Sequence, residues 1–346
     1  MKEKIQKVKG ILCEYGQEHL LRYFKELSAK EKESLLDQIL SIDFDLIASL
    51  YKKIINNHEM NEHQQDLQPL KAYDWEAIDD QEKERLYDIG IKKIKDGKAA
   101  VILLAGGQGT RLSYSGPKGT FDIGLPSHKS LFQLQCERLI NISRKCGIYI
   151  NWYIMTSYVN HDETIQFFDD NNYFNYPKEK ITFFKQGMLP TIDVNGKIFL
   201  QERGKISMAP NGNGGCFLAL KDKGILTEMK ERGIDGDIEY PKEPNGYKFE
   251  SFIFDIFSHV SDMTALKVKR EEEFAPVKNK DGEDSPFTAK NLVLDLHKNW
   301  LINSGVNPKL FDGKTVEISP LTSYNGENID KEVIIDKLFQ SDILLI

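Results

Sequence analysis

The sequence predicts an α/β fold whose central unit is a doubly wound sheet of parallel strands. Three apolar segments support this prediction, because each is continuous enough for a strand that is buried on both faces: Ala99–Ala105, Trp152–Met155 and Ile181–Phe184. Helical segments are expected between them, at Leu131–Ser143 and around Glu163–Phe168. Strands that alternate with helices in this way form parallel sheets through right-handed crossovers.

Helices are also expected on both sides of this central unit. Ser28 and Glu31 have the spacing of a capping box, and an apolar helical series follows them. Further along the chain, Ser285-Pro286 has the form of a helix start, and Gly305 is placed to end that helix. Apolar residues from Phe249 to Val260 also recur at helical spacing.

These elements predict three parts of the chain. Residues 1–95 form a helical amino-terminal arm, and residues 96–260 form the central α/β domain. Residues 261–346 contain the remainder of that domain and a small β-rich carboxyl-terminal unit, with short strands and turns from Thr315 onward.

Composition excludes several classes of protein. The 346 residues include 46 Lys and Arg against 53 Asp and Glu, and the net charge of −7 argues against broad nucleic-acid binding. The longest apolar run, Ala99–Ala105, is far too short to span a membrane, and no secretory signal begins the chain. The four cysteines lack metal-like or disulfide-like spacing. We therefore expect a cytoplasmic protein without nucleic-acid or membrane partners.

A glycine-rich turn follows the first predicted strand. Leu104-Ala105-Gly106-Gly107-Gln108-Gly109-Thr110-Arg111-Leu112 allows backbone amides to converge on a phosphate without interference from Cβ atoms, and Arg111 adds a fixed positive charge. A dinucleotide-binding fingerprint would need glycine or alanine at Leu112, which disfavours a dehydrogenase-like protein. A P-loop ending at Gly313–Thr315 would need glycine where Pro308 stands.

Four further segments contain residues that could bind a nucleotide. Lys118, held between Gly-Pro and Gly, suits phosphate, although such a lysine on its own is more often an ordinary turn residue. Ser207–Gly215 exposes amide groups that could bind a base or a sugar, although it could equally be a flexible turn. Gln186 follows a predicted strand end, where α/β proteins contact ligands. Lys278 lies in a polar turn, where a lysine usually faces solvent.

Together these segments resemble the eukaryotic-type UDP-N-acetylhexosamine (UDP-N-acetylglucosamine) pyrophosphorylases of the UDP-sugar pyrophosphorylase (UDPGP type 1) family. The similarity extends from about Trp75 to Tyr324. The motifs that carry it are, in chain order, Leu104–Leu112, Gly116–Gly119, Trp152–Ser157, Gln186–Pro190, Ser207–Gly215, Glu243–Lys248, Phe252–Phe257, Arg270–Asn279, Glu317–Leu321 and Ser323-Tyr324.

The resemblance implies a Rossmann-like, nucleotide-sugar-transferase (GT-A-like) central domain. It also implies transfer of a uridylyl group from UTP to N-acetylglucosamine 1-phosphate, which yields UDP-GlcNAc and pyrophosphate for amino-sugar nucleotide biosynthesis, with Mg²⁺ as cofactor. The family's catalytic cations would correspond to Arg111, Lys118 and Lys278. Its substrate-binding residues would be Leu104, Ala105, Gly106 and Gly107 at the nucleotide, Gln186 and Gly212 at uracil, Asn213 beside the nucleoside and Lys248 at a phosphate.

The sequence departs from the family after Ile234. The family continues there into a strand that ends in Val-Asp-Asn, whose aspartate helps to hold the metal, and into a loop that binds the sugar and ribose. This chain passes instead to Asp235–Tyr240, so a block that includes the metal-binding aspartate is missing, and the central domain is expected to be incomplete. Asp235, Asp237 and Glu239 are more simply loop carboxylates than replacement ligands. The loss should leave sheet edges unpaired and apolar faces uncovered.

Three interpretations therefore stay open. The chain is an active uridylyltransferase for N-acetylglucosamine 1-phosphate, a catalytically impaired nucleotide-binding remnant of that enzyme, or a UDP-hexose pyrophosphorylase with another sugar preference. The retained motifs favour an enzyme, whereas the missing metal ligand and sugar loop favour a remnant that still binds UTP weakly with Mg²⁺. The missing block is the part that would distinguish the sugars.

Overall fold

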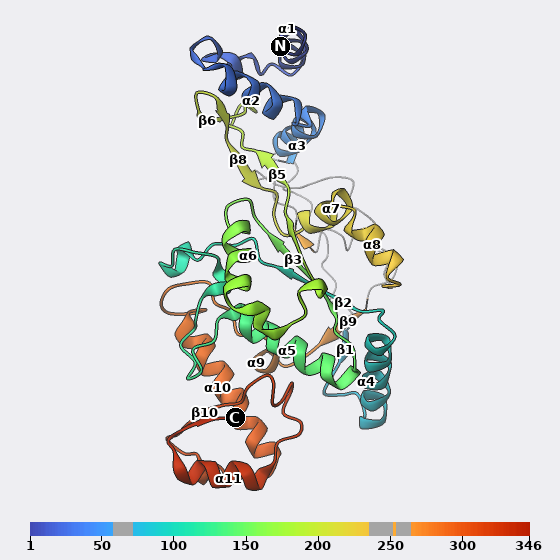
Figure 1. Ribbon diagram of the computed structural model, residues 1–346, viewed down its shortest axis with the longest axis vertical. Helices are drawn as coiled ribbons and strands as arrows, with labels where there is room; N and C mark the ends of the chain where they lie inside the picture. The colour runs from blue at the N-terminus through green and yellow to red at the C-terminus, as the bar shows by residue number, and fades with distance from the viewer. Residues whose placement is uncertain (58–71, 235–251, 254–263) are drawn as a thin grey trace. The chain divides into compact units, whose positions relative to one another are not determined.

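The computed structural model describes two compact units (Figure 1) and covers residues 1–57, 72–234, 252–253 and 264–346. Each unit combines stretches that are far apart in the sequence. Of the described residues, the first unit contains 1–57, 186–223 and 252–253, and the second contains 72–185, 224–234 and 264–346. The expected division near residues 95 and 260 stays a prediction.

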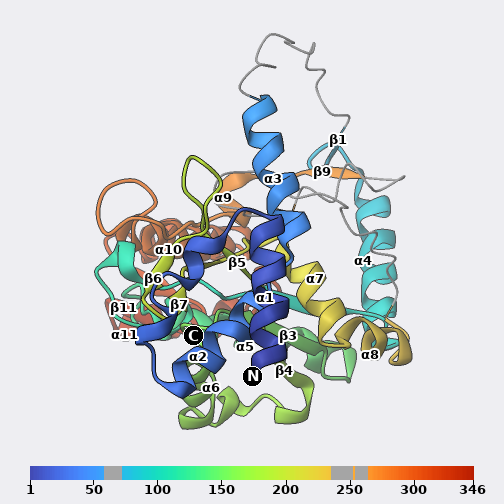
Figure 2. The same cartoon turned by 90° about the horizontal axis from the view of Figure 1, so that it is seen from above.

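The first unit packs the amino-terminal helices against short antiparallel strands. Ser28 and Glu31 form the predicted capping box at the start of α2, and α2 lies beside β7 (Figures 1 and 2). Leu35, Leu36 and Ile39 of α2 are fully buried. Its elements are α1 (Lys2–Glu14), η1 (Glu18–Leu21), η2 (Phe24–Glu26), α2 (Ala29–Leu40), α3 (Phe44–Asn57), β5 (Met188–Pro190), β6 (Leu200–Glu202), β7 (Lys205–Ile206), β8 (Met208–Pro210) and α7 (Gly215–Asp222).

The second unit is organised around the predicted parallel sheet, whose strand order is β2-β3-β4. Its α5 and α6 connect successive strands in the same direction, so right-handed crossovers place both helices on one face. Phe132 of α5, Trp152 of β3 and Phe168 of α6 share the resulting apolar cluster. The elements are β2 (Ala100–Leu104), α5 (Leu131–Cys146), β3 (Asn151–Thr156), α6 (His161–Asp170) and β4 (Ile181–Lys185).

Further elements of the second unit surround this sheet. As predicted, Ser285 caps a helix that has Pro286 at its first position, and the positive φ of Gly305 follows the end of that helix. The remaining elements are β1 (Ala72–Asp74), α4 (Asp80–Lys95), η3 (Thr110–Leu112), η4 (Lys118–Thr120), η5 (Asn172–Asn175), η6 (Lys178–Lys180), α8 (Ile225–Glu231), β9 (Ala265–Lys267), α9 (Arg270–Glu273), α10 (Pro286–Asn303), η8 (Pro308–Leu310), β10 (Thr315–Glu317), α11 (Lys331–Gln340) and β11 (Ile343–Leu345).

The first predicted strand is less buried than its apolar sequence suggests. Every residue of β2 is partly exposed, whereas Trp152, Tyr153, Ile154 and Met155 of β3 are almost fully buried. Of the described strands, β3 alone pairs with β2. The prediction that Ala99–Ala105 is buried on both faces is therefore wrong: its residues are partly exposed, and β2 is an outer strand among the strands that the structure describes.

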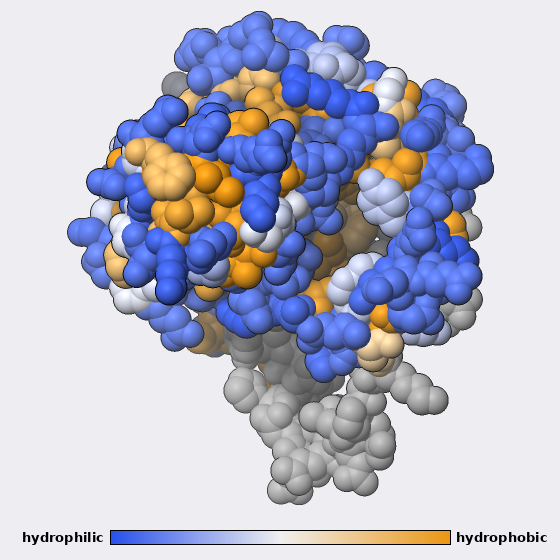
Figure 3. Space-filling model, turned by 90° about the horizontal axis from the view of Figure 1, so that it is seen from below, coloured by the Kyte–Doolittle hydropathy of each residue, from blue (hydrophilic) through white to orange (hydrophobic). Residues whose placement is uncertain are grey.

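The carboxyl-terminal segment differs from the expected strands and turns. It contains α11, which Asp330 caps by accepting hydrogen bonds from the amides of Glu332 and Val333. Apolar side chains remain exposed here, including Phe339 of α11 and Ile343 of β11, and apolar patches lie between charged residues on the face shown in Figure 3. The helix expected between Phe249 and Val260 lies almost wholly outside the described residues. No described helix is both long and apolar enough to cross a bilayer.

Burial of His297, a residue of α10, makes the stability of the second unit depend on pH. Burial, reinforced by the positive charge of Arg138, lowers the pKa of His297 from 6.5 to about 4. The histidine of the unfolded chain therefore takes up a proton near pH 6.5, whereas that of the folded chain does so only near pH 4. The contribution of His297 to the unfolding free energy is fully present above pH 6.5 and is lost as the pH falls toward 4.

We predict that urea denaturation will show a loss of about 2 kcal/mol in unfolding free energy from this histidine between pH 7 and pH 5. In His297→Gln, which keeps an acceptor for the Ile318 amide, this part of the pH dependence should disappear. An identical pH dependence in both proteins would contradict the assignment.

Candidate functional site

The glycine-rich loop after β2 folds back on the segment that contains Lys118. The Gly109 amide donates a hydrogen bond to the Gly116 carbonyl at 3.0 Å, and the Lys118 amide donates to the Gly107 carbonyl at 3.1 Å. These two bonds form an isolated antiparallel bridge between Gln108 and Pro117. The two motifs that the sequence suggested for phosphate binding therefore lie side by side.

Three successive amides of this loop have no acceptor among the described residues: Gly106, Gly107 and Gln108. The preceding residues differ, because Leu104 belongs to β2 and the Ala105 amide donates to the Met155 carbonyl at 2.7 Å. Among the predicted backbone contacts, Gly106 and Gly107 thus keep free donors and Ala105 does not. Free amides on consecutive residues can bind the oxygen atoms of an anion.

The glycines of the site serve different purposes. A Cβ atom at Gly109 would lie 2.7 Å from the Tyr114 ring, and one at Gly119 would lie 2.1 Å from the Phe132 ring, so packing requires both glycines. A Cβ atom at Gly107 would meet nothing within 4 Å, and the φ of Gly107 is not positive. Since neither packing nor conformation requires glycine at 107, space for a ligand is the remaining physical reason for it.

Three positive side chains gather at this loop. Partial burial lowers the pKa of Lys118, and the neighbouring charges of Arg111 and Lys278 lower it further. Neither Arg111 nor Lys118 has a carboxylate partner in the described part of the chain, whereas Lys278 Nζ lies 3.1 Å from Asp284 Oδ2. Mutually repelling cations next to free amides form a site that a polyanion would stabilise.

Lys278 reaches this site from a segment that is anchored in the core. Val277 is buried against Ile123 and Leu125, and the Lys278 amide donates to the Asp284 carbonyl at 2.6 Å. The lysine thus extends from a fixed backbone, and its exposed side chain agrees with the expectation that a lysine in this turn faces solvent. Asp284 would compete only weakly with a bound anion for Lys278, because ion pairs at the surface contribute little to stability.

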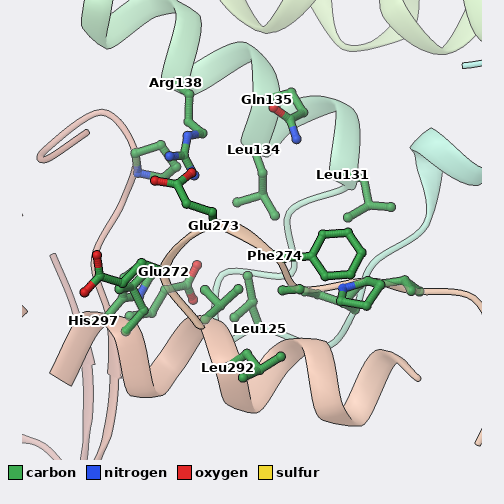
Figure 4. A pocket seen from close by; sticks show the side chains of 18 of the residues that line it. Leu125, Leu131, Leu134, Gln135, Arg138, Glu272, Glu273, Phe274, Leu292 and His297 are labelled. Atoms are coloured by element: carbon green, nitrogen blue, oxygen red, sulfur yellow. The ribbon is translucent and has the colours of Figure 1, made fainter. Parts of the chain in front are cut away.

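A pocket of about 380 Å³ lies behind the same segment, between α5 and α10 (Figure 4). Its wall is mainly apolar, with Leu125, Leu134 and Leu292 among the lining residues. Arg138 lines one end, but its guanidinium stacks on the Tyr324 ring at 5.0 Å. The pocket therefore lacks the free cations that a triphosphate needs, and the glycine loop is the better anion site.

The predicted uracil-contacting residues belong to the first unit. Gln186 is only 6% exposed, and its side-chain amide has no hydrogen-bond partner among the described residues. Gly212 and Asn213 lie in the loop before α7, where Asn213 Oδ1 accepts a hydrogen bond from the Ile253 amide at 3.0 Å. Within the described chain, nothing thus competes with a ligand for Gln186, whereas the oxygen of Asn213 is already engaged. Lys248, Asp235, Asp237 and Glu239 lie outside the described residues.

The described residues do not fit a resident divalent cation. They bring together no group of three His, Cys, Asp or Glu side chains that could hold a metal ion. The groups at the glycine loop are mainly cations and amide donors, with the carboxylate of Glu163 near Gly116. The described residues thus offer no site that the protein alone would build for Mg²⁺, and the cofactor stays a prediction of the resemblance.

Known proteins identify the family. Residues 44–236 match the family described as UTP–glucose-1-phosphate uridylyltransferase. A probable UDP-N-acetylglucosamine pyrophosphorylase from Dictyostelium discoideum is 31% identical, and the match covers 94% of this chain and 95% of that protein. The chain belongs to the UTP–glucose-1-phosphate uridylyltransferase family. UDP-N-acetylglucosamine diphosphorylase 2 from Arabidopsis thaliana is another relative, 29% identical over 92% of this chain.

The fold of this uridylyltransferase-family chain also matches a solved structure. The uridine diphosphate N-acetylglucosamine pyrophosphorylase from Trypanosoma brucei, solved in complex with an inhibitor, covers 100% of the chain with a TM-score of 0.78 at 23% identity. The predicted α/β fold is thereby confirmed.

The alignment with the relatives also agrees with a missing internal block. The Dictyostelium alignment spans 467 positions although this chain has 346 residues, so many positions of the relative have no counterpart here. The family match ends at residue 236, next to the point where the sequence departs from the family pattern.

The sequence did not reveal the polar groups that hold the loop in place. Asn160 is completely buried and donates hydrogen bonds to the carbonyls of Ala105 and Gly107. Its place just before α6 is typical of a helix cap, and this was the only available signal. His161 is partly buried, and its Nδ1 lies 2.7 Å from Thr156 Oγ1.

Alanine substitutions should separate the two kinds of glycine. We predict that Gly119→Ala lowers the unfolding free energy by about 1–3 kcal/mol, because the new Cβ overlaps the buried Phe132 ring. Gly107→Ala should be neutral or stabilise by up to about 1 kcal/mol, because its Cβ enters open space and the unfolded chain loses freedom. Thermal and urea denaturation will measure both. Equal destabilisation would show that Gly107 is also a packing residue.

Proposed function

We propose that this chain binds UTP and transfers its uridylyl group to N-acetylglucosamine 1-phosphate, forming UDP-GlcNAc and pyrophosphate. The observation that supports this most strongly is the group of three cations, Arg111, Lys118 and Lys278, beside a loop with three unpaired amides. The sugar phosphate is proposed because several relatives are named as UDP-N-acetylglucosamine pyrophosphorylases or diphosphorylases. We further propose that the free amide of Gln186 reads uracil. The cytoplasmic location stays a prediction.

The proposed reaction needs no nucleophile from the protein. An oxygen of the sugar phosphate attacks the α-phosphorus of UTP, the new P–O bond forms, and the bond to the bridging oxygen of the β-phosphate breaks to release pyrophosphate. Negative charge on the α-phosphoryl oxygens and on the leaving group has to be balanced. Amides of Gly106, Gly107 and Gln108 supply fixed dipoles, and Arg111, Lys118 and Lys278 supply positive charge. Catalysis is thus assigned to positioning and to electrostatic stabilisation.

A second candidate is a chain that binds UTP but does not turn it over. The missing block and the partly exposed β2 strand favour this candidate, because the resemblance places the family's metal-binding and sugar-binding segments in that block. A third candidate, a preference for another hexose 1-phosphate, shares the same nucleotide site. Substrate comparison separates all three.

We expect the purified chain to release pyrophosphate from UTP when N-acetylglucosamine 1-phosphate and Mg²⁺ are both present. A coupled phosphate assay measures the release, with glucose 1-phosphate as the alternative acceptor and omission of the sugar phosphate as the control. UTP binding without release would support the remnant, and faster release with glucose 1-phosphate would support the third candidate. Absence of both binding and release would overturn the proposal.

Replacing Lys118 should separate binding from stability. We predict that Lys118→Met weakens UTP about ten- to a hundredfold in calorimetry, because a charge-assisted contact to phosphate is lost. Its thermal stability should stay unchanged or rise, because Lys118 is repelled by Arg111 and Lys278.

The matched control is Lys280→Met, which removes the same charge from an exposed position two residues beyond Lys278 and should leave UTP affinity unchanged. Equal affinities for the two variants would make Lys118 an ordinary turn lysine.

A further inference from the structure

The side chain of Asn160, at the start of α6, makes four hydrogen bonds, and two of them reach the glycine loop. Asn160 is 0% exposed. Its Oδ1 accepts from the Ser157 amide at 2.8 Å and from the Ser157 hydroxyl at 3.0 Å, and its Nδ2 donates to the Ala105 carbonyl at 2.9 Å and to the Gly107 carbonyl at 3.3 Å. Every hydrogen-bonding position in the plane of the amide is therefore used.

The orientation of this amide group follows from its partners. The Ser157 N–H can only donate, so it must face the oxygen of Asn160. The carbonyls of Ala105 and Gly107 can only accept, so they must face the nitrogen. Rotating the amide by 180° would lose all of these bonds in a buried position. Asn160 thus holds two loop carbonyls in one fixed direction.

Fixing the carbonyls also fixes the amides that follow them. A peptide bond is planar, and in the trans form its C=O and N–H point in opposite directions. The described residues contain no cis peptide bonds. When Asn160 holds the carbonyls of Ala105 and Gly107, the N–H groups of Gly106 and Gln108 must point away from it. These are two of the three amides without an acceptor among the described residues.

We infer that Asn160 is a positioning residue for the anion site. It turns the amides of Gly106 and Gln108 toward the ligand by binding the opposite ends of their peptide groups. This inference rests on the proposed function for the identity of the ligand, a nucleoside triphosphate. The geometry of the loop itself is independent of that identity, so one experiment can test the inference with no nucleotide present.

Hydrogen–deuterium exchange of the nucleotide-free chain provides this test. In Asn160→Asp the side chain keeps its size and its acceptor toward Ser157 but loses both donors. We therefore expect faster exchange in the peptide that covers residues 105–109, at the hydrogen-bonded amides of Ala105 and Gly109. Ser157→Ala removes one support of Asn160 and should give a smaller increase, which keeps the test informative if Asn160→Asp folds poorly. The matched control is Asn141→Asp, because Asn141 is also buried and donates to the Pro320 carbonyl at 2.8 Å.

Calorimetric titration with UTP completes the test. We expect the affinity of Ser157→Ala and of Asn160→Thr, which adds no charge, to fall about tenfold, because the loop then has to be ordered during binding. Asn141→Asp should lose thermal stability but retain its UTP affinity. Unchanged loop exchange in the Asn160 variants would overturn the inference even if UTP binds. If exchange increases but the unaltered chain does not bind UTP, the positioning role is supported and the proposed function fails.

Discussion

The planarity of the peptide bond is the constraint on which this site depends. Each peptide group in the loop after β2 presents a carbonyl on one side and an amide on the other. The protein binds the carbonyls of Ala105 and Gly107 and leaves the amides of Gly106, Gly107 and Gln108 without acceptors in the described chain. Together with the cations nearby, this division of polar groups produces a local positive site on a chain whose net charge is −7.

Much of the site could be predicted because its elements are local in sequence. The apolar run of β2, the glycines that follow it and the nearby Lys118 lie within twenty residues, and the bridge between Gln108 and Pro117 brings the two motifs together. Lys278 could be identified only by resemblance, because its position depends on the burial of Val277 among residues far away in the chain. Asn160 could not be predicted, because a helix cap and a support for another loop have the same local sequence.

The partial exposure of β2 also could not be predicted from the local sequence. Its composition is that of a central strand, and hydrophobicity alone does not show whether a neighbour is present on the second edge. The uridylyltransferase relatives have a block that this chain lacks, and the family match ends where that block is expected. The hydrogen bonds that hold the glycine loop do not depend on that block. Their partners are Met155 in β3, Gly116 in the segment that contains Lys118, and Asn160 just before α6. Nucleotide binding and turnover can therefore be lost separately.

The most direct measurement is a two-dimensional amide NMR titration of the chain with UTP. The account predicts that the resonances of Gly106, Gly107 and Gln108 shift strongly and together as UTP is added, while Gly147, at the end of α5 in the same unit, stays unchanged. If UTP left the three loop resonances in place, whether or not other resonances moved, the claim that these amides hold the triphosphate would be contradicted.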